Sequence, residues 1–95
     1  MKIMISQPMR GKTTEQIKQE REELVKELEG QGHEVIDTVL DISENKSPIY
    51  YLAKSIELLA QADAIFFMKG WKDARGCRIE HKVAVAYGKQ VYYEN

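Results

Sequence analysis

Short apolar segments alternate with amphipathic segments along the whole chain, and this alternation limits the fold more than any other feature. The strand-like segments are Lys2–Ser6, part of His33–Leu40, Asp63–Met68 and Gln90–Tyr93. Strands that alternate with helices of this length form parallel sheets through right-handed crossovers. We therefore predict an α/β fold of order β-α-β-α-β-α-β. It is a small, doubly wound, open parallel sheet of the flavodoxin or Rossmann type, with helices on both faces.

The first helix is expected to open at Thr13, because Gln16 three residues later completes a capping box. Gly30 and Gly32 are expected to stop it. The inward stripe of this helix is predicted to be Ile17, Leu24, Val25 and Leu28.

The second and third helices have similar boundary residues. Ser47 and Pro48 place a cap and a first-turn proline at the start of the second helix. Its helical spacing predicts an apolar stripe of Ile49, Leu52, Ala53, Ile56, Leu59 and Ala60. The third helix is predicted from about Gly76 to a stop at Gly88. Between the second strand and the second helix, residues 41–46 are predicted to form a polar loop.

Composition narrows the class of protein. A chain of 95 residues with 43% hydrophobic and 31% charged residues is predicted to form one domain over residues 1–95. Its net charge of −1 and the absence of a basic stripe argue against polymeric nucleic acid as a partner. No segment resembles a signal peptide or a membrane span, and the single Cys77 fits a reducing compartment. We expect a cytoplasmic protein that forms a homodimer or a larger assembly, because so small a core gains stability from buried subunit contacts.

Three segments are expected to converge at the carboxyl edge of the sheet, where open α/β folds bind ligands. They are Gln7–Thr14, the polar loop after the second strand, and Lys69–Gly76. Exposed N–H groups at a helix start, with Arg10 and Lys12, form a plausible site for an anion. A true P-loop is disfavoured, because its first glycine would fall at Ser6. The alternative is a capped helix entry with solvated basic side chains.

Glu80 is the most informative single residue. It follows a buried strand and shares one helix face with small or apolar residues: Gly76, Cys77, Val83, Ala84 and Tyr87. A carboxylate on such a face is costly to bury. This cost, at the edge where the fold places its chemistry, makes Glu80 the leading catalytic candidate.

Asp73 and Trp71 lie in the same edge loop, and each has two interpretations. Two carboxylates around one cleft can divide acid–base and nucleophilic duties, but Asp73 also suits a turn or a helix cap. Trp71 suits stacking on a planar base, and equally suits a rim or an interface.

The sequence offers little for a metal or a cysteine nucleophile. His33, His81 and Cys77 lack the spacing of a metal site. A helical pair of Cys77 and His81 remains an alternative, although a small packed core residue is the favoured reading of Cys77. We expect neither a metal nor a cofactor.

The order of these segments resembles the nucleoside 2-deoxyribosyltransferase superfamily, which includes deoxynucleoside-monophosphate N-glycosidases and short, often phage-borne domains. The resemblance is carried by the opening Met1–Lys12 and by Gly70-Trp71, Gly76-Cys77 and Glu80. The longer pattern is a strand ending in Ala62-Asp63, a glycine-containing loop, Glu80, and then Ala84 and Gly88-Lys89.

The resemblance implies roles for individual residues. The glutamate at the position of Glu80 is the nucleophile that attacks the anomeric carbon, and Asp73 is the nearest candidate for handling the leaving base. Arg10 falls where monophosphate-specific members contact phosphate. Ser55 stands where active members carry an aspartate, and Ala74 stands where they often carry a serine. The residues expected to bind substrate are Ser6, Gln7, Arg10, Gly11, Ser55, Trp71 and Gly76.

Two functions are consistent with the sequence. The first is an N-glycosidase or deoxyribosyl transferase that acts on a nucleoside or its 5′-monophosphate through Glu80. The second is a non-catalytic module that binds a nucleotide-like small molecule at the same edge. A flavin or dinucleotide binder is weaker, because no Gly-x-Gly-x-x-Gly turn follows the first strand.

Overall fold

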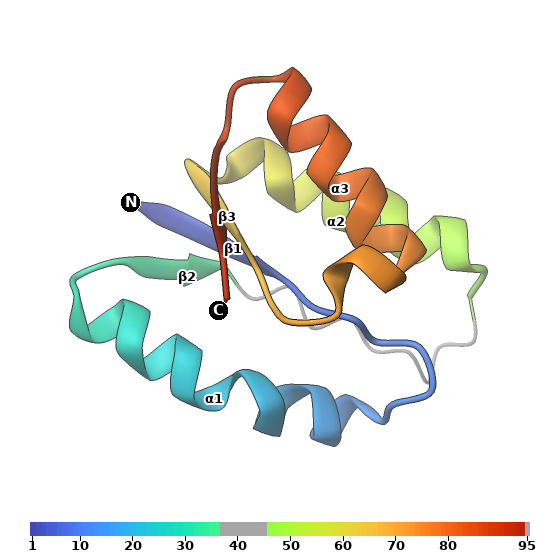
Figure 1. The fold of residues 1–95 in the computed structure, drawn as a ribbon, viewed down its shortest axis with the longest axis horizontal. Helices are drawn as coiled ribbons and strands as arrows, with labels where there is room; N and C mark the ends of the chain where they lie inside the picture. Colours follow the sequence, from blue (N-terminus) through green and yellow to red (C-terminus); the bar gives the residue numbers. More distant parts are fainter. Residues whose placement is uncertain (37–45, 95) are drawn as a thin grey trace.

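A computed structural model describes residues 1–36 and 46–94 of the chain, and it has the predicted α/β architecture (Figure 1). Its sheet is four-stranded and entirely parallel, in the order β2-β1-β3-β4. The elements are β1 (Lys2–Ser6), α1 (Thr14–Gly30), β2 (Glu34–Ile36), α2 (Pro48–Gln61), β3 (Ala64–Phe67), the 3-10 helix η2 (Trp71–Asp73), α3 (Arg75–Ala86) and β4 (Gln90–Tyr93).

The strand order changes direction at β1. The chain goes from β1 to β2 on one side, with Ile3 opposite Val35, and then crosses to β3 on the other side, where Ile3 is opposite Ala64. Such a reversal opens a crevice at the carboxyl ends of the two central strands. The topology therefore makes the edge beyond Ser6 and Phe67 the candidate position for a ligand site.

The helices cover both faces of the sheet, as predicted (Figure 1). Ile3 and Ile5 of β1 pack in a buried cluster with Leu28 of α1. Met4 points to the opposite face, where it packs with Leu59 of α2 and Ala84 of α3. Because side chains alternate along a strand, Ser6 lies on the same face as Met4.

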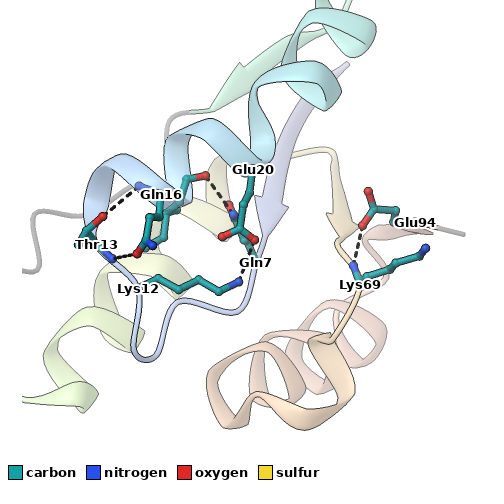
Figure 2. A network of polar contacts seen from close by, with 8 residues as sticks. Gln7, Lys12, Thr13, Gln16, Glu20, Lys69 and Glu94 are labelled. Carbon is teal, nitrogen blue, oxygen red and sulfur yellow. Dashed lines mark hydrogen bonds and ion pairs between the residues drawn. The ribbon is translucent and has the colours of Figure 1, made fainter.

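The predicted start and end of α1 are confirmed. The Thr13 hydroxyl accepts a hydrogen bond from the Gln16 amide, and the Gln16 side chain accepts one from the Thr13 amide (Figure 2). Gly30 is its last residue, and Gly32 has a φ of +89°. Of the predicted stripe, Ile17 and Leu28 are buried and Leu24 and Val25 are half-buried. Arg21 is also buried, which the apolar pattern did not predict.

The predicted start of α2 is confirmed, but part of its inward stripe is wrong. Ser47 caps the helix and Pro48 opens it. Ile49 is 73% exposed, and Ala53 and Ala60 are exposed as well. The buried or half-buried residues of α2 are Tyr51, Leu52, Ser55, Ile56, Leu58 and Leu59. The apolar surface of α2 is wider than the strip that the sheet covers, so periodicity alone could not identify which edge of it is buried.

The region between β2 and α2 is only partly described. Val39 of the predicted second strand and residues 41–45 of the predicted polar loop lie outside the described residues. Past β3, the chain forms η2 before α3 begins at Arg75, one residue earlier than predicted. The Lys69 amide donates to the Glu94 carboxylate at 2.8 Å, which joins this loop to the end of β4 (Figure 2).

Within the described ranges, no helix has both the length and the apolar character needed to cross a membrane.

Candidate functional site

Glu80 lies on the inward face of α3 and is 7% exposed. Cys77 and Ala84 are buried on the same face, as the helical spacing predicted. Tyr87 does not belong to this face, which corrects the prediction: it is 78% exposed. The helix ends at Ala86, so Tyr87 is its C-terminal cap and no longer follows the helical spacing.

The hydroxyl of Ser6 donates a hydrogen bond to Oε1 of Glu80 across 2.6 Å. Ser6 is the last residue of β1 and is 2% exposed. The bond joins two residues 74 positions apart in sequence. It places the carboxylate of α3 directly at the carboxyl end of the central strand.

The environment of Glu80 opposes ionisation. Burial raises the pKa of its carboxyl group, while hydrogen bonds from Ser6 and then Ser55 lower it. Among the described residues, no Lys, Arg or His forms an ion pair with Glu80. Hydroxyl groups rather than a cation therefore stabilise the charged form.

Cys77 lies one helical turn before Glu80 and is buried as a free thiol. Burial raises the pKa of the thiol to about 11, a hydrogen bond with Ser6 lowers it, and the nearby charge of Glu80 raises it. The thiol therefore stays protonated near neutral pH, where it is a poor nucleophile. Its burial favours the interpretation of Cys77 as a packed core residue.

Glu80 opens onto a cleft of about 930 Å³ at the carboxyl edge of the sheet. The loop after β1, the first turns of α2 and α3, and the loop around η2 line it. Among the residues expected from the sequence, the cleft brings together Ser6, Gln7, Arg10, Gly11, Ser55, Asp73, Gly76 and Glu80. Trp71 is not among its lining residues.

Basic side chains outnumber acidic ones in the lining of this cleft. The basic residues are Arg10, Lys12, Lys46, Arg75 and Arg78, and the acidic ones are Asp73 and Glu80. Lys12 is engaged by Glu20 at 2.8 Å (Figure 2), and Arg78 donates to the Lys72 carbonyl at 3.1 Å. Arg10 is exposed and makes no ion pair with any described residue. The same holds for Arg75, so both guanidinium groups are available to an anionic ligand.

The start of α3 presents open backbone at the cleft. Ala74 precedes the helix and makes no side-chain capping bond. At Gly76 in the first turn, an added Cβ would meet nothing within 4 Å. Unpaired N–H groups and the helix dipole favour negative charge at such a position.

Gln7 serves α1 more than the cleft. Its side-chain amide donates to the Ile17 carbonyl at 3.0 Å, on the α1 side of the sheet (Figure 2). Its Oε1 is buried without a hydrogen-bond partner among the described residues. Gln7 lines the cleft because it directly follows Ser6, but its side-chain amide is bonded to α1.

Trp71 belongs to an aromatic cluster that the sequence analysis missed. Its ring stacks on His81 with centroids 4.5 Å apart and on Tyr93 with centroids 5.6 Å apart, and Phe67 packs against all three rings. His81 Nε2 and the Tyr93 hydroxyl are 2.7 Å apart. These residues come from β3, η2, α3 and β4, so no local spacing could reveal the cluster. Stacking of Trp71 on a base finds no support in this arrangement.

His33, His81 and Cys77 do not come together. In the described part of the chain, no three His, Cys, Asp or Glu side chains group as metal ligands do. The potential chemistry of the cleft rests on Glu80, Asp73, the hydroxyl groups and the basic side chains.

Comparison with protein-family models gives a match over nearly the full chain. No curated protein and no solved structure shows significant similarity to it. Residues 1–93 match the family model described as a domain of unknown function, DUF4406. The chain therefore belongs to the DUF4406 family.

Proposed function

We propose that this protein is an N-glycosidase or deoxyribosyl transferase that acts on a nucleoside or its 5′-monophosphate, with Glu80 as the nucleophile. The observation that carries the proposal is a buried carboxylate without a cationic partner among the described residues, held by Ser6 and facing a cleft. Because such a group is costly to bury, a functional reason for retaining it is favoured.

The proposed reaction has two steps. A carboxylate oxygen of Glu80 attacks the anomeric carbon, and the bond between that carbon and the base nitrogen breaks with its electron pair moving to the base. The base then takes up a proton from solvent. Water or a second base next attacks the same carbon and gives up a proton to solvent, the ester bond breaks, and the Glu80 carboxylate is regenerated. Asp73 lines the same cleft and is the candidate for contact with the leaving base.

The basic side chains support the monophosphate as a substrate. Arg10 is exposed and lines the cleft, and the uncapped start of α3 lines it as well. A phosphate group would gain charge-assisted hydrogen bonds from a guanidinium and from backbone N–H groups.

The direct test is to incubate the protein with a panel of deoxynucleosides and their 5′-monophosphates and to measure free base by chromatography. We expect base release from at least one compound, and none from the same compound with the Glu80→Gln variant. A panel in which every compound stays intact would reject the enzymatic proposal.

A second function is supported by the basic lining itself, which does not depend on Glu80. In this alternative the protein is a non-catalytic module that binds a nucleotide-like ligand. Calorimetry separates the two: a binding module gives a measurable affinity for a nucleotide whose base is never released. Without the need for an anionic nucleophile, the Glu80→Gln variant would bind such a ligand as well as the wild type does.

The assembly and location are also proposals. We propose a cytoplasmic homodimer or larger assembly, because large hydrophobic side chains are exposed at Tyr87, Tyr92 and Tyr93. Light scattering is expected to give at least twice the monomer mass of 11.0 kDa. A monomer at high micromolar concentration would contradict this.

A further inference from the structure

Ser6 is placed to do more than contact substrate. Its single hydroxyl proton is directed at Oε1 of Glu80, and the 2.6 Å separation is in the range of a short hydrogen bond to an ionised oxygen. Ser6 is itself fixed, because it lies in β1 and pairs in register with Phe67 of β3. The hydroxyl therefore reaches Glu80 from a central strand of the sheet.

The hydrogen bond from Ser6 fixes one of the two oxygens of the Glu80 carboxylate. Oε1 is engaged by the hydroxyl. A second hydrogen bond, from Ser55 of α2, also reaches the carboxylate, and Glu80 lines the cleft. A carboxylate held in one rotamer presents its oxygens in a fixed direction, which is what an attack on a bound carbon requires.

The neighbours of Glu80 from each element are few. Ser6 comes from β1, Ser55 from α2 and Cys77 from α3, and the Cys77 thiol is uncharged near neutral pH. The charged groups that line the same cleft are Arg10, Lys12, Lys46, Asp73, Arg75 and Arg78. Of the hydrogen bonds that favour ionised Glu80, the one from Ser6 is the stronger.

We infer that Ser6 is a positioning residue for Glu80: its hydroxyl fixes one carboxylate oxygen, favours the anionic form of this buried group, and holds the carboxylate in one orientation at the cleft. The inference rests on the proposed function for its catalytic consequence. Its structural part concerns only the state of Glu80, and that part can be measured without any substrate.

The first measurement is an NMR titration of the Glu80 side-chain carbon, assigned by its loss in the Glu80→Gln variant. In Ser6→Ala the pKa of Glu80 is expected to rise, because a hydrogen bond that favours the anion is lost. Cys77→Ala is the control: it also truncates a buried neighbour of Glu80, and although it removes the contact of Ser6 with the Cys77 thiol, it leaves the Ser6 hydroxyl present as a donor to Glu80. Its effect is expected to be much smaller.

The second measurement is the pH profile of base release. Ser6→Ala is expected to lower kcat by about 10- to 100-fold with KM changed less than twofold, as expected for one hydrogen bond to a charged group. The acidic limb of the profile is expected to move to higher pH, since a larger share of Glu80 is protonated. Ser6→Thr keeps the hydroxyl and is expected to restore most of both properties.

The outcomes separate the inference from the proposed function. If Ser6→Ala leaves both the Glu80 pKa and the pH profile unchanged, the positioning role is wrong even though the enzyme is active. If the wild type releases no base but the Glu80 pKa still rises in Ser6→Ala, the positioning role stands and the glycosidase proposal fails. If Ser6→Ala does not fold, Ser6→Cys, with a weaker donor, replaces it. An unchanged Glu80 pKa in Ser6→Cys would overturn the inference.

Discussion

The two faces of the sheet are built from the same strands but differ in what they do with polar groups. On the α1 face, Ile3, Ile5 and Leu28 form a buried apolar cluster, and the Gln7 amide is used up on the Ile17 carbonyl. On the face of α2 and α3, the apolar cluster gives way at the carboxyl edge to Ser6 and Glu80. The difference is that the face of α2 and α3 places a buried carboxylate at the carboxyl edge, where the candidate site lies, whereas the cluster on the α1 face is apolar.

The largest expected effect is the loss of base release when Glu80 is replaced, with the fold left intact. Glu80→Gln is expected to reduce base release by at least about 10³-fold, because an amide keeps the shape of the side chain but cannot act as an anionic nucleophile. The measurement is base release at saturating substrate. Glu23→Gln, at an exposed position of α1, is the matched control and should retain full activity. Comparable loss in both variants would show that Glu80 has no special role.

A substitution on the α1 face is expected to lower stability and to leave activity unchanged. Ile17 is fully buried, so Ile17→Ala is expected to lower the free energy of unfolding by about 2–5 kcal/mol through lost burial and a cavity. The kcat of the folded fraction should stay unchanged, as measured below the midpoint of a urea titration. A large fall in kcat under native conditions would mean that the α1 face also shapes the cleft.

Arg10 tests whether the cleft recognises charge. Arg10→Ala is expected to weaken binding of a nucleoside monophosphate by roughly 1.5–3 kcal/mol and to leave the neutral nucleoside nearly unaffected. Calorimetry with both ligands measures the two values. Arg78→Ala is the control within the same lining, because Arg78 is held by the Lys72 carbonyl and should matter less. Equal losses for charged and neutral ligands would identify Arg10 as structural.

The smallest expected effect is on the free energy of unfolding, which the buried carboxyl group of Glu80 lowers when it is ionised. The pKa of Glu80 is raised in the folded protein, so the folded state binds its proton more tightly than the unfolded state does. Ionised Glu80 is then unfavourable to folding, and this penalty grows as pH rises from the unfolded pKa through the folded pKa. Glu80→Gln is expected to stabilise the protein by roughly 1–2 kcal/mol at pH 7.

The gain from Glu80→Gln should shrink toward zero as the pH falls below about 4, where the wild-type carboxyl is protonated in both states. Urea unfolding of the two proteins across this pH range measures the difference. A variant that is less stable than the wild type at neutral pH would contradict a net penalty.

The parts of the structure that depend on local pattern could be predicted from sequence. The capping box at Thr13 and the Ser47-Pro48 helix start lie within a few residues, and both are present. Convergence of the loops after β1 and β3 followed from the parallel topology. The site residues Arg10, Asp73 and Glu80 could therefore be expected at one edge, and all three line the cleft.

What depends on long-range packing could not be predicted. The Ser6–Glu80 bond and the stacking of Trp71 on His81 join separate elements, and neither leaves a periodic signal. The apolar positions of α2 form a wider band than the sheet covers, so the exposure of Ile49 was not foreseen. Pairing Ser6 with Glu80 required knowing that the last residue of β1 faces α3, which depends on the register of the strand.

The measurement that tests the central role of Glu80 most directly is covalent trapping. A 2-fluoro-2-deoxyribosyl substrate analogue slows breakdown of a sugar–enzyme intermediate, because fluorine destabilises the oxocarbenium-like transition state. Peptide mass spectrometry of the wild-type protein is expected to find the sugar on Glu80 and to find no adduct in Glu80→Gln. An adduct on Asp73 or Cys77 would contradict the assignment of the nucleophile. No adduct on any residue, together with no base release from any deoxynucleotide, would contradict the enzymatic account as a whole.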